Sequence, residues 1–197
     1  MRDKMRTFKQ LEKTMQKKEF DEFAIRITEV YATSSIEYTQ KKIAIDNNVT
    51  ANTIRKLMDY TIIIALIPLA LAQKVLNKSI ESQRNKVKDS GYNSILHHRE
   101  LLKKREEYLT YSYLPSKVKE IANDISSSDK PLSSFKDKYN LESDEITKRI
   151  LKRAIEENIV SDEVMERLFS RSLKIKNTEY ARKYFDFLRY ERKINNK

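Results

Sequence analysis

The sequence contains very few residues that interrupt a helix. Its 197 residues include one glycine and three prolines. Two-residue β-hairpins and dinucleotide-binding loops both depend on glycine, because glycine tolerates positive φ angles that other residues avoid. We therefore expect helices joined by short polar turns, in an all-α fold.

Cysteine is absent and there are only two histidines. The lack of cysteine excludes disulfides, cysteine-containing zinc sites and a thiol nucleophile, and it fits a reducing compartment, so we expect a cytoplasmic protein. His97 and His98 are neighbours that point about 100° apart on a helix. They cannot form a metal site as an i, i+4 pair would, and we expect them at the surface.

Sequence motifs of common enzymes are missing as well. The chain has no P-loop, no dinucleotide fingerprint and no zincin motif. With 29 acidic residues, a pair of carboxylates alone does not indicate catalysis. We therefore expect a protein that is not an enzyme and that holds no cofactor and no metal.

Long apolar runs are also missing. The one apolar run, residues 61–72, is about half as long as a spanning helix and contains Pro68. The N-terminal residues MRDKMRTFKQ lack the apolar segment of a secretory signal. We expect the run to be buried core and the protein to have no membrane partner.

The formal net charge of +11 is concentrated at the two ends. Residues 1–18 hold seven Lys or Arg against two Asp or Glu, and residues 171–197 hold nine against three. The remaining residues carry 24 of each sign. Basic ends predict an acidic partner such as nucleic acid, and the alternative is that they only give solubility.

Two stretches of the chain share a pattern that predicts an internal repeat. Residues 49–80 align with residues 141–173 when one residue is inserted near the middle. Ile54 then matches Ile146, and residues 74–80 match residues 167–173. The shared pattern of apolar and polar positions, more than identity, supports two related helical lobes at 19–82 and 114–176.

The first copy has the local chemistry of a helix, a turn and a second helix. Residues 40–47 form the first helix, and Asn47 and Asn48 tolerate the turn conformation. Thr50 is expected to cap the second helix, which places Ile54, Leu57 and Met58 inward. Pro68 is predicted to break the chain and start a third helix.

The second copy repeats this arrangement with different residues. Residues 132–139 form its first helix, Asn140 makes the turn and Ser143 caps the second helix. Ile146, Ile150 and Leu151 face inward, and Ser161 is predicted to start the third helix.

Three further segments complete the expected domain organisation. Residues 1–18 are predicted to form a basic amphipathic helix, and residues 83–113 a polar link followed by a charged connecting helix. Residues 177–197 are predicted to form a basic, aromatic C-terminal helix.

Residues 40–58, QKKIAIDNNVTANTIRKLM, resemble the helix-turn-helix of homeodomain-like and sigma-factor-like bacterial DNA-binding domains. The shared elements are an Ile-Ala pair in the first helix, a polar turn, an apolar residue before the cap, and Thr-Ile in the second helix. The turn departs from the family pattern, because Asn47 or Asn48 stands where these domains usually have glycine.

The resemblance implies that the second helix lies in the major groove of double-stranded DNA. The residues that it places against base edges are Ala51, Asn52, Arg55 and Lys56, and those that it places near phosphates are Gln40, Lys41, Lys42 and Thr50. Asn can pair with adenine, and Arg with guanine, through two hydrogen bonds. The alternative is that Arg55 and Lys56 form a solvated helix face.

The second copy is predicted to read DNA poorly. Glu142, Asp144 and Glu145 occupy the positions that would meet phosphates, where they would repel DNA. The residues that could compensate are Lys148, Arg149 and Lys152. We expect this lobe to pair with the first lobe, with a second copy in a homodimer, or with a protein partner.

The C-terminal segment offers further basic residues beside aromatic ones. Arg182, Lys183, Arg189 and Arg192 could hold a nucleic-acid backbone, and their aromatic neighbours could stack on bases. The alternative is that these aromatics form core, which would leave only the basic residues available.

Two functions from different classes fit these features. The first is a DNA-binding regulator or accessory protein. Because the chain is rich in Lys, Ile, Asn and Tyr, as an AT-rich coding sequence would give, we expect it to belong to a bacterial phage, plasmid or other mobile element. The alternative is a helical interaction module, an inhibitor or adaptor, that uses the helix-turn-helix shape as a scaffold.

Overall fold

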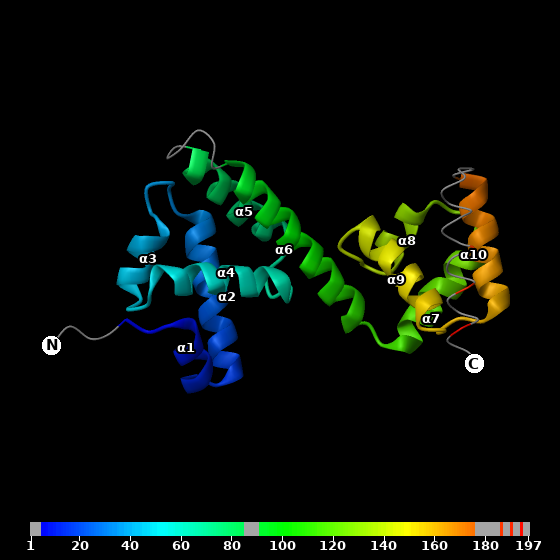
Figure 1. The fold of residues 1–197 in the computed structure, drawn as a ribbon, viewed down its shortest axis with the longest axis horizontal. Coiled ribbons are helices and arrows are strands. Elements are labelled where there is room, and N and C mark those ends of the chain that lie inside the picture. Colours follow the sequence, from blue (N-terminus) through cyan, green and yellow to red (C-terminus); the bar gives the residue numbers. More distant parts are fainter. Residues whose placement is uncertain (1–4, 85–90, 176–185, 187–189, 191–193, 195–197) are drawn as a thin grey trace. The chain divides into compact units, whose positions relative to one another are not determined.

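The computed structural model describes residues 5–84, 91–175 and the single positions 186, 190 and 194. Within these residues the fold is all-α, as predicted (Figure 1). In chain order the helices are α1 (Phe8–Thr14), α2 (Lys17–Thr33), α3 (Gln40–Asp46), α4 (Ala51–Ile63), α5 (Leu69–Arg84), α6 (Gly91–Ser112), α7 (Pro115–Ser126), α8 (Leu132–Lys138), α9 (Asp144–Glu156) and α10 (Asp162–Ile175).

The chain divides into two compact units, Met1–Tyr108 and Leu109–Lys197. Each has its own cluster of buried apolar side chains. In the part of the chain that the structure describes, no helix is long and apolar enough to cross a membrane.

Unit 1 is built around α4, which packs against α1, α2, α3 and α5. Ile54, Leu57 and Ile62 of α4 are fully buried, together with Ile27 of α2 and Ile43 of α3. Each such side chain stabilises the unit by roughly 1.5–3 kcal/mol relative to leaving it exposed. The apolar stripe that the sequence predicts for this helix is therefore the centre of the first core.

The predicted helix, turn and helix of unit 1 are confirmed as local structure. Asn48 has a φ of 50°, and the amide of Val49 donates to the Ala44 carbonyl at 2.9 Å, which closes the end of α3. The Thr50 hydroxyl accepts from the Thr53 amide at 3.1 Å and caps α4.

Unit 2 contains a four-helix arrangement formed by α7 to α10. Asn140 has a φ of 51°, and the Ser143 hydroxyl accepts from the Ile146 amide at 3.3 Å to cap α9. Ile146 and Ile150 of α9 pack with Ile121 of α7 in the second core. These local features of the second copy are also confirmed.

The predicted break before the third helix is present in both units. In unit 1, α4 ends at Ile63, Ala65 has a φ of 57°, and Pro68 immediately precedes α5. In unit 2, Asn158 has a φ of 53° between α9 and α10. The apolar run is therefore divided between two helices.

The two units share the order and the lengths of their central helices. Helices α3 and α8 have seven residues each, and α4 and α9 have thirteen each. One residue separates Asn48 from the cap Thr50, whereas two separate Asn140 from Ser143. The extra residue of the second copy thus lies in the turn, not near the middle of the repeat, and the internal repeat itself stays a prediction.

Three of the expected segments either differ from the prediction or lie mostly outside the described residues. Residues 5–7 are extended, so that the basic segment 1–18 holds the short helix α1 and the first residues of α2. Helix α6 is more than a connector, because Leu101 and Arg105 are buried in unit 1. Most of 177–197 lies outside the described residues, and Tyr190 within it is exposed.

Candidate nucleic-acid interface

Helices α3 and α4 present five of the eight predicted DNA-binding residues to solvent. The exposed residues are Lys41, Lys42, Asn52, Arg55 and Lys56. Asn52 and Arg55 lie three positions apart on one face of α4, and Arg55 Nη2 donates to Asn52 Oδ1 at 3.4 Å. The residues with the chemistry to pair with bases therefore lie together at the N-terminal end of α4.

The other three predicted residues are engaged within the protein. Gln40 is half-buried and hydrogen-bonds the Tyr31 side chain. Thr50 uses its hydroxyl to cap α4. Ala51 packs against the core of unit 1. We therefore assign these three to the structure of the helix-turn-helix.

An acidic residue that the sequence interpretation missed lies on the same face of α4. Asp59 follows Arg55 by four positions, and its Oδ1 lies 3.4 Å from His97 Nε2 of α6. Burial raises the pKa of Asp59, while His97 and Arg55 oppose that shift. Because the pairing joins residues far apart in the chain, no local sequence signal could have revealed it.

The neighbouring histidine is not at the surface, contrary to expectation. His98 is 7% exposed, and its Nδ1 is buried with no hydrogen-bond partner among the described residues. Burial, together with the adjacent His97, lowers the pKa of His98. The described residues hold no group of three or more His, Asp or Glu that could bind a metal ion.

The exposed cations of the helix-turn-helix have no carboxylate within ion-pair distance among the described residues, although the charge of Arg55 acts on Asp59. Among the described residues, Lys41, Lys42, Arg55 and Lys56 form no ion pair with a carboxylate. Their charge is therefore available to a ligand.

Unit 2 differs sharply in this respect. On α9, Lys148 Nζ lies 3.1 Å from Glu145 Oε2, and Lys152 Nζ lies 3.5 Å from Glu156 Oε1. The third predicted compensating residue, Arg149, is half-buried. The helix that corresponds to α4 in order and length thus pairs its cations with carboxylates of its own.

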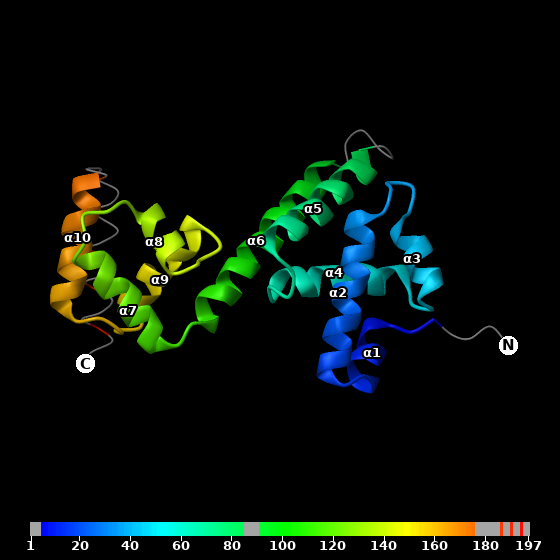
Figure 2. The same cartoon turned by 180° about the vertical axis from the view of Figure 1, so that it is seen from behind.

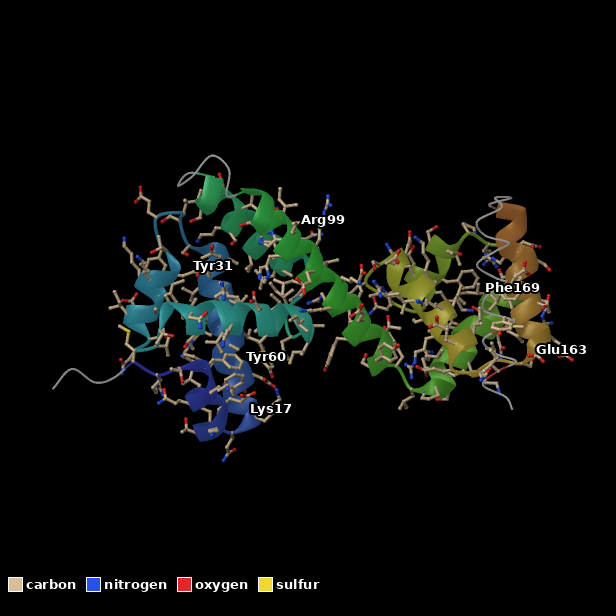
Figure 3. All side chains as sticks on the ribbon, viewed as in Figure 1. Lys17, Tyr31, Tyr60, Arg99, Glu163 and Phe169 are labelled. Atoms are coloured by element: carbon tan, nitrogen blue, oxygen red, sulfur yellow. The ribbon has the colours of Figure 1, made fainter. Side chains whose placement is uncertain are left out.

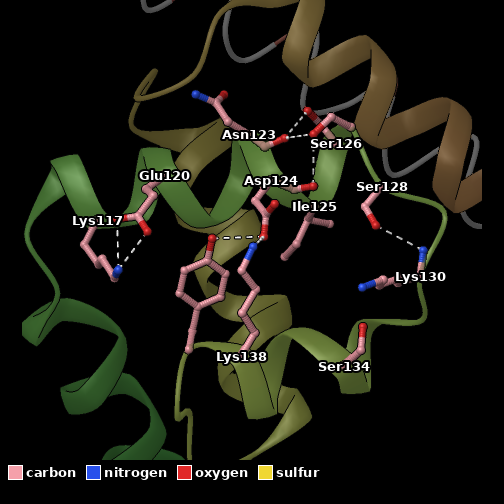
Figure 4. Close-up of polar contacts among 12 residues, drawn as sticks. Lys117, Glu120, Asn123, Asp124, Ile125, Ser126, Ser128, Lys130, Ser134 and Lys138 are labelled. Carbon is pink, nitrogen blue, oxygen red and sulfur yellow. Dashed lines mark hydrogen bonds and ion pairs between the residues drawn. The ribbon is translucent and has the colours of Figure 1, made fainter.

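Two further lysines of unit 2 are paired in the same way (Figure 4). Lys138 Nζ donates to Asp124 Oδ2 at 2.7 Å, and the Tyr139 hydroxyl donates to the same oxygen at 3.0 Å. Lys138 lowers the pKa of Asp124, whereas burial and the bond to Asp124 raise the pKa of Tyr139 to about 12. Lys117 Nζ is paired with Glu120 at 2.9 Å.

A polar cluster fixes α4 against the first two helices (Figure 3). The Tyr60 hydroxyl donates to Asp21 Oδ1 at 2.6 Å, and Lys17 contacts both groups. The Tyr60 ring also packs edge-on against Phe8 and Phe20, with centroids 6.2 and 5.3 Å away. These contacts hold the axis of α4 and so determine which of its residues face solvent.

The chain before α1 makes a contact that sequence analysis did not anticipate. The Arg6 amide donates to the Asn48 carbonyl and the Thr50 amide donates to the Arg6 carbonyl, each at 3.1 Å. The Thr53 hydroxyl donates to the same Arg6 carbonyl at 3.3 Å. Arg6 is thereby held beside the turn that precedes α4.

The predicted C-terminal contacts, Arg182, Lys183, Arg189 and Arg192, lie outside the described residues. The candidate interface therefore consists of α3, α4 and the segment at Arg6. Comparisons with protein-family models, with curated protein sequences and with solved structures find no match to this chain.

Proposed function

We propose that the protein binds double-stranded DNA through α3 and α4 of unit 1 and acts as a DNA-binding regulator or accessory protein. In this proposal the N-terminal end of α4 enters the major groove. Asn52, Arg55 and Lys56 contact base edges, and Lys41 and Lys42 contact phosphates.

The observation that carries the proposal is the contrast between the two central helices. The cations on α3 and α4 have no carboxylate partner among the described residues, whereas Lys148 and Lys152 on α9 are ion-paired. A cation that gains a phosphate releases counterions from DNA, which drives binding. A lysine already paired with a carboxylate brings a compensating negative charge to the same surface.

The residue types on α4 support recognition as well as attraction. An Arg side chain can donate two hydrogen bonds to guanine, and an Asn side chain can exchange two with adenine. The mutual hydrogen bond of Asn52 and Arg55 is long, at 3.4 Å, and both side chains are exposed. Replacing that bond by base contacts therefore costs little.

The proposal is tested by mobility shifts on random and genomic DNA at several salt concentrations. We expect binding that weakens steeply with salt. The double variant Asn52→Ala/Arg55→Ala should lose roughly 1–3 kcal/mol of discrimination for each base contact removed, with stability almost unchanged.

The matched control removes two cations from the corresponding helix of unit 2. Lys148→Ala/Lys152→Ala should change affinity little and equally on every sequence, because any contact there is to phosphate. Greater loss of discrimination from this pair than from Asn52 and Arg55 would contradict the proposal. Absence of binding at low salt would instead support the alternative, a helical module that binds a protein partner.

The matched order of elements supports a further part of this proposal, that the two units are copies of one helical arrangement. Only the first copy then has a DNA-binding face, because Glu145 pairs with Lys148 at the start of α9. Unit 2 is assigned to contacts with protein, either a second copy of this chain or another partner.

A further inference from the structure

The segment before α1 is fixed to the helix-turn-helix by its backbone alone. The Arg6 amide and carbonyl both bond to residues 48–53, so that its position is tied to the cap of α4. The Arg6 side chain takes no part in these bonds and is exposed. A cation is thus held at the edge of the candidate interface with its charge available.

The residues that follow Arg6 are also held in place, because they start helix α1. The Thr7 hydroxyl accepts from the Gln10 amide, and the Gln10 side chain accepts from the Thr7 amide, a capping box that starts α1. Lys9 is exposed in the first turn of α1, and that turn contains no acidic residue. Arg6 and Lys9 therefore form a small basic edge.

The segment that carries this basic edge and the helix α3 lie on opposite sides of α4 in the two ribbon views (Figure 1 and Figure 2). Figure 1 shows the N-terminal end of α3 above α4 and the dark-blue segment that leads into α1 below it. Figure 2 shows the same order from behind. The major groove is about 12 Å wide and is bordered by two phosphate backbones, so a helix within it lies between two rows of negative charge.

We infer that Arg6 and Lys9 bind the phosphates of one DNA backbone while Lys41 and Lys42 bind those of the other. The inference rests on the proposed function and deepens it, because it gives the protein contacts on both sides of the groove. The contacts are assigned to phosphate, since the backbone of Arg6 is bonded to the turn and to Thr50 and Thr53, not to the exposed face of α4 that carries Asn52 and Arg55.

The first test measures the salt dependence of DNA affinity in the full chain. Each phosphate contact contributes about 0.9 to the slope of log K against log salt concentration. Arg6→Ala/Lys9→Ala should lower that slope by about 2 and weaken binding by the same factor on every sequence. Arg6→Lys keeps the charge and should keep most of the affinity.

The matched control is Lys74→Ala, which removes an exposed cation from α5 of the same unit. It should leave the slope unchanged. An unchanged slope in Arg6→Ala/Lys9→Ala, while Asn52→Ala/Arg55→Ala still loses discrimination, would overturn this inference and leave the proposed function standing. Failure of the unmodified chain to bind DNA would overturn both.

The second test locates the contacts, and the absence of cysteine from the chain makes it specific. Arg6→Cys and Lys41→Cys are each labelled with an iron chelate that cleaves nearby DNA, on a duplex with one selected site. We expect the two probes to cleave across the major groove from one another. Cleavage from both positions at the same backbone, or none from position 6, would contradict the assignment.

Discussion

His98 illustrates how a single buried group makes stability depend on pH. Burial, helped by the neighbouring His97, holds the pKa of His98 below its ordinary 6.5. As pH falls below about 6.5, the unfolded chain binds a proton at this residue that the folded unit does not. Unfolding is therefore favoured progressively at lower pH, and the stability present above that pH is lost.

We expect His98→Leu to reduce the loss of stability between pH 7 and pH 5, measured by urea unfolding followed by circular dichroism. Leucine has no proton to gain and leaves no buried nitrogen without a partner. His97→Gln is the matched control, because His97 is half exposed, and it should keep most of the acid sensitivity. Equal acid sensitivity in His98→Leu and the unmodified chain would show that another group is responsible.

Helix ends in this protein are closed with almost no glycine. At one of them Ala65 adopts a left-handed backbone, which lowers the stability of the folded state. The amides of Ala65 and Leu66 donate to the carbonyls of Ile62 and Thr61, and the backbone of Ala65 is left-handed. A non-glycine residue in this conformation costs roughly 1–2 kcal/mol, although Asn tolerates it better. The corresponding position in unit 2 is occupied by Asn158.

We therefore expect Ala65→Gly to stabilise unit 1 by about 1 kcal/mol. Asn158→Gly should stabilise unit 2 less, because Asn already accepts the conformation. Chemical unfolding of both variants and the unmodified chain measures the difference. A larger gain at position 158 would mean that the left-handed backbone is not what limits stability at these ends.

Other helix C-termini are closed by cations that reach them from later helices. Lys78 Nζ of α5 donates to the carbonyls of Tyr31 and Ser34 at 2.6 and 2.7 Å, at the end of α2. Arg105 of α6 donates to the carbonyls of Ile62 and Ile67 at 2.9 and 2.8 Å. Lys78 thus meets carbonyls at the negative end of the α2 dipole, whereas Arg105 meets one carbonyl near the end of α4 and one in the link before α5.

Unit 2 closes two helix ends by the same device. Arg153 of α9 donates to the carbonyls of Thr110 and Tyr113, and Arg171 of α10 donates to the Ile125 carbonyl at the end of α7. In the sequence alignment Arg171 is the counterpart of Lys78. These two cations thus join equivalent helices of their units, which is consistent with the predicted repeat.

The separation along the chain of the residues in contact explains which features could be predicted from the sequence. The turn at Asn48, the caps at Thr50 and Ser143 and the break at Pro68 depend on chemistry within a few residues, and all were predicted correctly. Three other features depend on segments that are distant in the sequence. They are the bonds between Arg6 and the turn, the contact of His97 with Asp59 and the burial of His98. Amphipathic periodicity gives the inward face of a helix, but it does not say which segment covers the opposite face.

At the scale of the whole molecule, charge distinguishes the two units more than fold does. Both contain a short helix, a left-handed Asn, a capped helix of thirteen residues and a break before the next helix. Lys41, Lys42, Arg55 and Lys56 of α3 and α4 form no ion pair with a carboxylate among the described residues, whereas Lys148 and Lys152 of α9 do. A ligand rich in phosphate should therefore bind one unit and leave the other unchanged.

This difference can be measured by hydrogen exchange of the full chain with and without a bound DNA duplex. At a free DNA concentration about 100 times Kd, binding stabilises the folded state of the bound unit by roughly 2.7 kcal/mol. Amides of α3, α4 and the segment at Arg6 that exchange only when unit 1 unfolds should then exchange about 100-fold more slowly. Amides of α8 and α9 should keep their rates, since Lys148 and Lys152 would have to give up Glu145 and Glu156 before they could bind phosphate. Equal protection of α9 would mean that those ion pairs open at little cost, and that the pairing of charges on unit 2 does not keep it from DNA.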